Sequence, residues 1–246
     1  MIRPLAHDLK GFYSSPLGAL ACRTLRRRIR EFWPDVVMNK QQHIEEVLVG
    51  FGYATPYLIP FMTTPDHVAR SRAIALMPTL QGVTPWPVAA KNRTAEIATN
   101  ELPLADCSVD RLLVVHALEA SERPSQMLRE LWRVLKPGGR MLVIVPNRAS
   151  LWAQRDNTPF GYGRPFSKGQ LLGLLDSAMF TTLNVGHGLY MLPVKNRLFL
   201  KTAPLFEYLG SRTADALGGV TLCEVEKRLY ATPATAEGKT QKLAEA

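Results

Sequence analysis

Short apolar runs that alternate with helical patterns constrain the fold of this 246-residue chain more than any other feature. Residues 73–77 and 110–116 are typical of buried strands, and the second run is continuous in apolar side chains, as central parallel strands are. Further strands are expected at 47–50, 96–98, 140–145, 181–185 and 220–230, and helices at 57–62, 124–135 and 167–175. This alternation predicts an α/β fold with a doubly wound, mostly parallel sheet and helices on both of its faces.

The N-terminal region predicts a basic amphipathic helix. Ser15 and Pro16 form a typical helix start, apolar residues recur at helical spacing after them, and Pro34 ends the run. Residues 1–30 hold seven Lys or Arg against one acid, Asp8, so they supply +6 of the formal net charge of +9. We expect the apolar stripe to pack on the main domain. The outer face is either a solvated surface or a binding surface for nucleic acid, protein or anionic lipid.

Three segments are expected: a helical extension at 1–40, the main domain at 41–230, and a polar, alanine-rich tail at 231–246 that we expect to be disordered. The three cysteines are far apart and form no metal-type pair, which predicts reduced thiols in a cytoplasmic protein and no metal site. No run of about 18 apolar residues predicts a membrane span, and no secretory signal is expected.

The stretch EEVLVGFGYATPY, residues 45–57, leads from the first strand into a loop with Gly50, Gly52 and the small Ala54. Such residues let a ligand approach the backbone, because a Cβ would block it. In doubly wound sheets, ligands bind beyond the carboxyl ends of the strands, so the loops after Gly50, Met77, Ala98 and His116 are candidate binding loops. The alternative for the glycine loop is a tight connection between strand and helix.

Three later segments resemble the type 11 group of class I S-adenosylmethionine-dependent methyltransferases. They are NELPLADCSVDRLLVVHALE (100–119), MLRELWRVLKPGGRMLVIVPN (127–147) and PFSKGQLLGLLDSAMF (165–180), of which the Lys-Pro-Gly-Gly block is the most specific. With the glycine loop, the resemblance covers roughly residues 45–185. It implies a seven-stranded sheet with an antiparallel last strand, and S-adenosylmethionine as a methyl donor lying across the strand ends.

The sequence departs from that family where acids usually hold the donor. Leu48 stands two residues before the first glycine, Met77 at the end of the second strand, and Ala98 near the expected adenine. Each lost charge-assisted hydrogen bond is worth roughly 1.5–3 kcal/mol. Adenine could instead lie between Met77 and Trp86, although Trp86 could equally be a core anchor. The expected donor-binding residues are Gly50, Gly52, Tyr53, Ala54, Met77, Trp86, Asn100 and Glu101.

His116, at the end of the fourth strand, is the candidate general base, with a structural histidine as the alternative. Tyr162 and Arg164 lie in a glycine- and proline-rich loop that could select the acceptor or simply connect two elements. Two functions remain open: a methyltransferase acting on an unidentified acceptor, and an inactive methyltransferase-like subunit that binds or regulates a partner.

Overall fold

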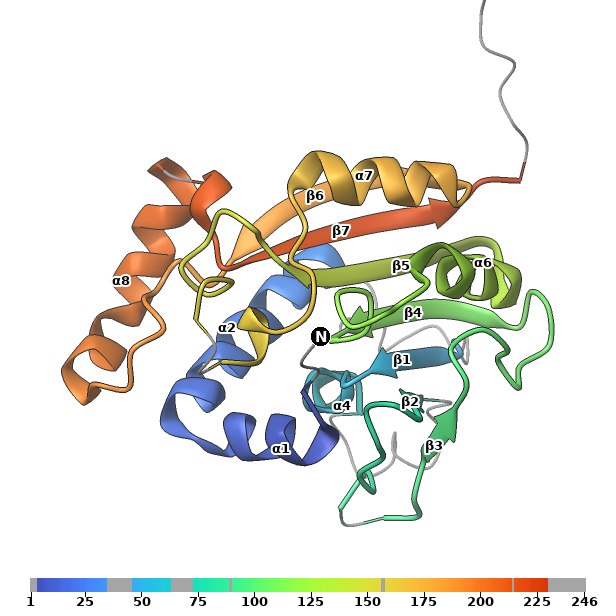
Figure 1. Ribbon diagram of the computed structural model, residues 1–246, viewed down its shortest axis with the longest axis horizontal. Coiled ribbons are helices and arrows are strands. Elements are labelled where there is room, and N and C mark those ends of the chain that lie inside the picture. The colour runs from blue at the N-terminus through green and yellow to red at the C-terminus, as the bar shows by residue number, and fades with distance from the viewer. Residues whose placement is uncertain are drawn as a thin grey trace, which may run out of the picture.

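The computed structural model describes residues 4–34, 46–62, 73–88, 90–155, 158–213 and 215–229. The expected tail at 231–246 lies outside the described residues. A single seven-stranded sheet runs through the molecule, with helices on both sides of it (Figure 1). Within the described part of the chain, no helix is long and apolar enough to cross a membrane.

The strands are β1 (Leu48–Gly52), β2 (Ile74–Pro78), β3 (Thr94–Ile97), β4 (Val109–Val115), β5 (Leu135–Pro146), β6 (Phe180–Gly188) and β7 (Val220–Lys227). Their order in the sheet is β3-β2-β1-β4-β5-β7-β6. The first five strands pair in parallel, and β7 is antiparallel to both of its neighbours. The expected doubly wound, mostly parallel seven-stranded sheet is therefore confirmed.

The start of β5 differs from the sequence-based expectation. The strand begins at Leu135, which pairs with Val109, rather than at Arg140. The pairing register then shifts between Val109 and Arg111, and Gly138 adopts a positive φ of 72°. The Lys-Pro-Gly-Gly run therefore lies inside an irregular first part of the strand instead of separating helix from strand. Glycine makes this possible because it accepts the left-handed region without strain.

The helices are α1 (Ala6–Ser14), α2 (Pro16–Phe32), α4 (Thr55–Leu58), α6 (Pro124–Val134), α7 (Lys168–Ser177) and α8 (Arg197–Thr213), with short 3₁₀ turns η1 (Ile59–Met62), η2 (Pro159–Gly161) and η3 (Asp215–Leu217). Ser15 caps α2 by accepting a hydrogen bond from the Gly18 amide at 3.1 Å, as its sequence signal predicts. The expected capping box at the start of α7 is also present. Neither α1 nor α8 was expected from the sequence, and Pro204 inside α8 is a residue that normally argues against a helix.

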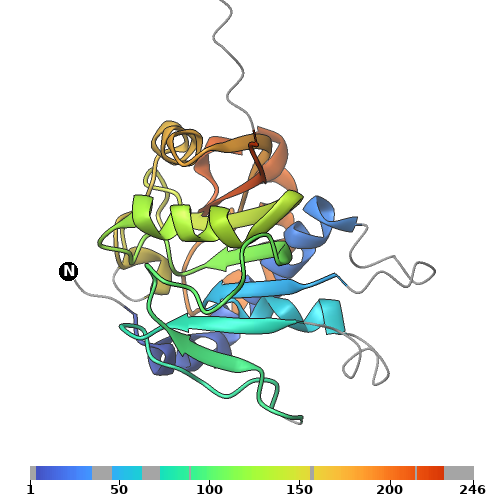
Figure 2. The same cartoon turned by 90° about the vertical axis from the view of Figure 1, so that its right-hand side faces the viewer.

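Two hydrophobic clusters cover the two faces of the sheet. Leu25 and Ile29 of α2 belong to one cluster, together with Leu142 of β5. Leu128 of α6 and Leu171 of α7 belong to the other. Figures 1 and 2 show α2 and α6 on opposite sides of the sheet. The prediction that the apolar stripe of the basic helix packs on the main domain is confirmed.

Candidate functional site

A cavity of about 180 Å³ opens at the carboxyl ends of β2, β3 and β4. Pro78 ends β2, Asn100 follows β3 and His116 follows β4, and all three line the cavity. The remaining lining residues come from the N-terminal segment, the loop after β2, the end of β3 and the segment from β4 into α6: Pro4, Leu80, Gln81, Thr99, Ala117, Ala120, Ser121, Glu122, Arg123, Gln126 and Met127. The cavity therefore lies where a doubly wound sheet is expected to bind its ligand.

His116 is buried at the inner wall of this cavity, and each of its ring nitrogens lies beside a polar side chain. Its Nε2 atom lies 2.7 Å from the hydroxyl of Tyr13, and its Nδ1 atom lies 3.4 Å from Oε1 of Glu119. The Tyr13 hydroxyl is also 2.6 Å from the hydroxyl of Tyr57. A positive φ of 54° at His116 turns the chain sharply after β4. The first helix, α1, thus contributes a tyrosine directly to the histidine at the strand end.

Burial determines the protonation of the two tyrosines. Desolvation raises the pKa of Tyr13 and of Tyr57 well above the ordinary value for a phenol. Both hydroxyls are therefore neutral at physiological pH, and each can donate one hydrogen bond while accepting another. The hydroxyl of Tyr13 can consequently pass a proton between His116 and a group placed beside it.

Several buried polar atoms around His116 have no hydrogen-bond partner within the described residues. They are Oε1 of Gln81 and Oε2 of Glu119, while Nδ1 of His116 and Oε1 of Glu119 make no hydrogen bond but face each other at 3.4 Å. The amide nitrogen of Gln81, in contrast, donates to the His116 carbonyl at 2.9 Å. An unsatisfied buried polar group costs roughly 1–3 kcal/mol, so native proteins seldom cluster them without a use. The cluster is typical of a site that receives a polar ligand.

The two glycines of the β1 loop have internal reasons to be glycine. A Cβ on Gly50 would come within 2.8 Å of Leu58 and 2.9 Å of Ala54. Gly52 has a φ of 78°, and a Cβ there would come within 2.3 Å of the Val115 carbonyl oxygen. These nearest atoms belong to the protein itself, which is what a tight connection from strand to helix requires.

Tyr53 covers the end of β1. Its ring stacks on the ring of Tyr13 at 5.9 Å, and only 4% of the residue is exposed. Ala54 is fully buried and stands at the start of α4. The part of the candidate donor site next to the glycines is thus covered by Tyr53 and α1.

Met77 and Trp86, the two residues expected to hold adenine, are both buried in hydrophobic clusters. Met77 packs in a cluster with Leu9 and Tyr53, and its sulfur accepts a hydrogen bond from the Thr84 amide at 3.4 Å. Trp86 is buried in the large core cluster, which agrees with its alternative role as a core anchor. Neither side chain is part of the cavity lining, so the expected adenine slot between them is not preformed.

Asn100 and Glu101 are adjacent in sequence, but only one of them lines the cavity. Asn100 lines the cavity. Glu101 is exposed and forms an isolated β-bridge with Ala98 instead. Of the polar residues expected near adenine, the structure brings only Asn100 to the cavity.

The loop at 158–166 contacts the His116 region through the Phe160 ring and through backbone atoms. The Phe160 ring lies 5.0 Å from the His116 ring. The Arg164 amide donates to the Glu119 carbonyl at 2.8 Å, and Gly163, with a φ of 79°, packs directly on the same carbonyl. The Arg164 side chain is exposed and that of Tyr162 half-buried. This loop therefore reaches the site, but through residues other than Tyr162 and Arg164.

Three members of the site, Tyr13, Tyr57 and Glu119, were not expected from the sequence. The first two lie 103 and 59 positions before His116 in the chain, and no local pattern relates them to it. Glu119 follows His116 by three residues, a spacing that could have suggested a pair.

Comparisons with known proteins show what the sequence and the fold are similar to. Residues 72–143 match the family described as "Methyltransferase domain". A protein of Mycolicibacterium smegmatis named "Probable S-adenosylmethionine-dependent methyltransferase" is 40% identical over 93 residues, which are 36% of each chain. A "Ubiquinone/menaquinone biosynthesis C-methyltransferase" of Rubrivivax gelatinosus is 42% identical over 55 residues, 22% of each chain. The matched part spans about a third or less of the length of these curated relatives.

Solved structures share the fold at low sequence identity. A "SAM dependent methyltransferase" from Archaeoglobus fulgidus superimposes with a TM-score of 0.54 at 15% identity, covering 82% of this chain and 93% of the other. The strand order and the fold likeness define a methyltransferase-type α/β fold. Residues 72–143 thus resemble the methyltransferase domain family, and the chain shares the fold of S-adenosylmethionine-dependent methyltransferases of known structure.

Proposed function

We propose that this chain transfers a methyl group from S-adenosylmethionine to an acceptor, and that the cavity at the ends of β2, β3 and β4 receives the adenosine end of the donor. The observation that supports this most is the cavity itself, which combines apolar walls with the unpartnered Oε1 atom of Gln81. Pockets that bind cofactors are typically apolar with a few convergent polar groups of this kind.

The residues present fit an adenosine better than they fit the whole donor. The amides of Asn100 and Gln126 can pair with the edge of a purine, and Pro78 and Met127 offer apolar surface to its faces. Tyr53 and α1 cover the end of β1, where the amino-acid end would lie. We infer that the adenosine end supplies most of the binding and that α1 adjusts when the donor enters.

S-adenosylmethionine, when bound, supplies a methyl group on a sulfonium, which is already an excellent leaving group. The work left to this chain is to position the acceptor and to remove its proton where it has one. We propose that His116 accepts this proton through the Tyr13 hydroxyl, since the two atoms are 2.7 Å apart. Glu119, with its carboxylate 3.4 Å from Nδ1, then stabilises the imidazolium that forms.

A second candidate function is a binding or regulatory subunit that no longer catalyses. The filled surroundings of Gly50 and Gly52 favour it, together with the neutral Met77 at the position where the family usually has an acid. In this case the basic outer face of α2 would be the interaction surface. The two functions differ in whether the chain binds the donor at all.

Titration calorimetry with S-adenosylhomocysteine separates the two functions. We expect the wild-type chain to bind in the micromolar range, and Ala120→Trp to bind about tenfold or more weakly, a loss of about 1.4 kcal/mol, because the indole fills the cavity that Ala120 lines. Ala105→Trp, at an exposed loop position, is the matched control and should bind like the wild type.

Absence of binding by a folded wild-type chain would contradict the enzyme and leave the regulatory subunit. Equal binding by wild type and Ala120→Trp would show that the donor binds outside this cavity.

We further propose a cytoplasmic location. The three cysteines, Cys22, Cys107 and Cys223, are free, which supports a reducing compartment.

A further inference from the structure

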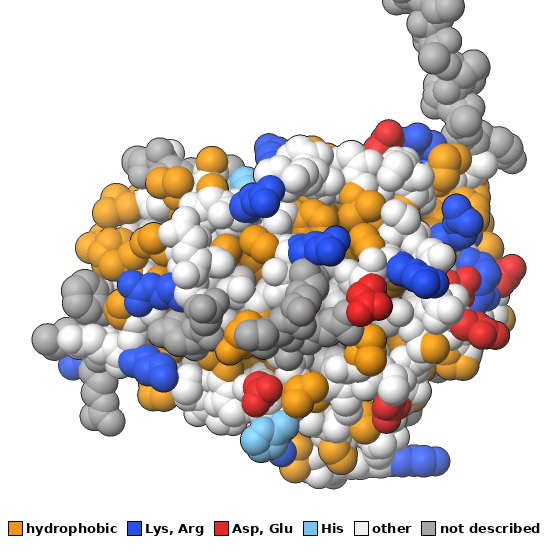
Figure 3. All heavy atoms as spheres, in the orientation of Figure 1, with side chains coloured by type: hydrophobic (Ala, Val, Ile, Leu, Met, Phe, Trp, Pro, Cys, Tyr) orange, Lys and Arg blue, Asp and Glu red, His pale blue; other side chains and the backbone are white. Residues whose placement is uncertain are grey.

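Helix α8 presents an exposed face on which apolar and cationic side chains alternate. Leu205, Tyr208 and Leu209 are 57%, 54% and 48% exposed. Lys201 and Arg212 are exposed as well. Each of these five residues lies three or four positions from at least one other of them, so they share one side of the helix. Figure 3 shows apolar side chains gathered over α8 at the left of the molecule.

Glu207, the acid in this part of α8, lies on the side of the helix away from the exposed leucines. Glu207 accepts a hydrogen bond from the Met191 amide at 3.1 Å, and its burial raises the pKa of its carboxyl group. Gly210 packs against the ring of Tyr190 on the same inner side. On the outer side, Arg212 lies over the Tyr208 ring with its Cζ 4.2 Å from the ring centroid. The outer face is thus apolar and positively charged.

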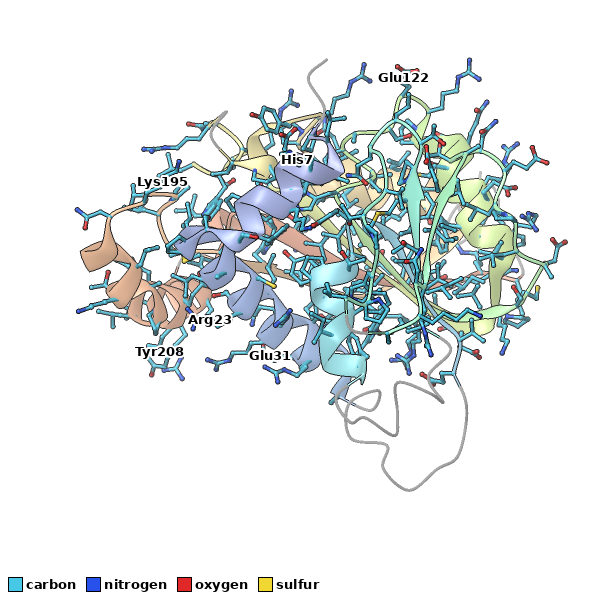
Figure 4. The ribbon with its side chains drawn as sticks, turned by 90° about the horizontal axis from the view of Figure 1, so that it is seen from below. His7, Arg23, Glu31, Glu122, Lys195 and Tyr208 are labelled. Carbon is cyan, nitrogen blue, oxygen red and sulfur yellow. The ribbon has the colours of Figure 1, made fainter. Side chains whose placement is uncertain are left out.

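Helix α2 extends this surface with further cations. It contacts α8, and its exposed Arg23, Arg27 and Arg30 recur at helical spacing. Among the residues that the structure describes, only Arg27 of these three has an acid against it, Glu31 at 3.3 Å, and Arg28 shares that acid. In Figure 4, Arg23 and Tyr208 lie near one another along the same edge of the molecule. We call the exposed sides of α8 and α2 together the α2–α8 face.

We propose that the α2–α8 face docks on an anionic lipid bilayer, with the leucines and Tyr208 of α8 entering the headgroup region and the cations of both helices contacting lipid phosphates. Helices that lie in a membrane interface have this composition: leucine and aromatic residues on one side, flanked by Lys and Arg. Tyrosine is also favoured at the level of the headgroups. A negatively charged bilayer complements both properties of the face at once.

Other occupants match only one of these properties. Nucleic acid would use the cations but leave the leucines of α8 exposed, since its affinity comes mainly from phosphate contacts. A second copy of the chain would bring the same positive charge against itself. The bilayer is therefore the occupant that charge and exposed apolar surface favour together.

Docking in this way leaves the cavity accessible. Glu122, which lines the cavity, lies at the edge of the molecule opposite to Tyr208 in Figure 4. The inference is therefore independent of the proposed methyl transfer, and either one can fail without the other.

Vesicle flotation with the full chain tests the proposal. We expect the wild type to float with vesicles of phosphatidylcholine and phosphatidylglycerol in equal parts, not with phosphatidylcholine alone, and to be released by high salt. Lys201→Glu/Arg212→Glu should weaken binding about tenfold or more, since each cation near an anionic surface contributes. Leu205→Glu/Leu209→Glu should weaken it at least as much.

Two variants on other surfaces are the matched controls. Arg129→Glu changes an exposed cation of α6 on the opposite side of the sheet, and Leu229→Glu changes a leucine that is 50% exposed after β7. Both should float like the wild type, and circular dichroism should show that all variants are folded.

Failure of the folded wild type to float with anionic vesicles would overturn the proposal, as would equal loss in the control variants. A dimer in light scattering that Leu205→Glu/Leu209→Glu abolishes, without vesicle binding by the wild type, would assign the face to a second copy. Binding to nucleic acid but not to vesicles would overturn the proposal and assign the α2–α8 face to nucleic acid.

Discussion

Gly52→Ala is expected to destabilise the chain by about 3 kcal/mol or more, because a non-glycine residue is strained in the left-handed region and its Cβ would also press against the backbone of β4. The φ of 78° at Gly52 supplies the first cost, and the 2.3 Å approach of a Cβ to the Val115 carbonyl supplies the second. Urea unfolding followed by circular dichroism measures the loss.

Gly82→Ala is the matched control for this effect. Gly82 has a φ of 80°, nearly the same as Gly52, but a Cβ there would meet nothing within 4 Å. We expect it to show only the strain of the backbone, about 1 kcal/mol. Equal losses in the two variants would mean that the contact with Val115 relaxes freely. A loss of donor binding in Gly52→Ala would therefore not identify Gly52 as a binding residue, because the loss of stability alone could cause it.

His116→Gln is expected to lower methyl transfer by roughly 10²- to 10⁴-fold, the usual contribution of a general base. Glutamine keeps a hydrogen-bonding group beside Tyr13 but accepts no proton at physiological pH. Tyr13→Phe removes the hydroxyl that lies 2.7 Å from Nε2 and should lower transfer to a similar extent. Incorporation of tritiated methyl from labelled S-adenosylmethionine into a cell extract measures these losses, whichever acceptor the extract supplies.

The binding of S-adenosylhomocysteine is the control for these two variants. It should stay within about threefold of the wild type, since the base acts on the acceptor and a difference below 1.4 kcal/mol is less than tenfold in affinity. Full transfer by a folded His116→Gln chain would make the histidine structural, as the alternative interpretation of the sequence holds. An equal fall in donor affinity and transfer would point to a collapsed cavity instead.

The sheet could be predicted from the sequence because its signals are local. Apolar runs such as 110–116 and the capping signal at Ser167 depend on a few neighbouring residues, and the order of the elements along the chain limits the topology to a doubly wound sheet. The boundaries were less accurate, as the early start of β5 shows. Pairing of Leu135 with Val109 extends that strand, and such pairing depends on the neighbouring strand.

The site was less predictable because it depends on contacts across the sequence. His116 was singled out by its place after a strand, a rule that holds for any parallel sheet, and Asn100 by its place near the position where the resembling family has an acid. Tyr13 was not, because only the docking of α1 brings it to His116 across 103 positions. The glycine loop follows β1 as expected, but the space beside Gly50 is taken by Leu58, which no local pattern reveals.

Helix α8 illustrates a different limit. Pro204 lies inside it and would normally end a helix, since proline lacks the amide hydrogen and clashes with the preceding turn. Tertiary contacts on its inner side, such as that of Glu207 with Met191, hold the helix in place despite the proline. The exposed leucines of the α2–α8 face therefore become visible as a surface only in the folded chain.

A crystal structure of the chain with S-adenosylhomocysteine tests the central claim most directly. We predict that the adenine lies in the cavity between Asn100 and Met127, and that Tyr53 or α1 moves to admit the amino-acid end. A cofactor bound away from the ends of β2, β3 and β4 would contradict the account, and so would crystals grown with excess cofactor in which the cavity is unchanged.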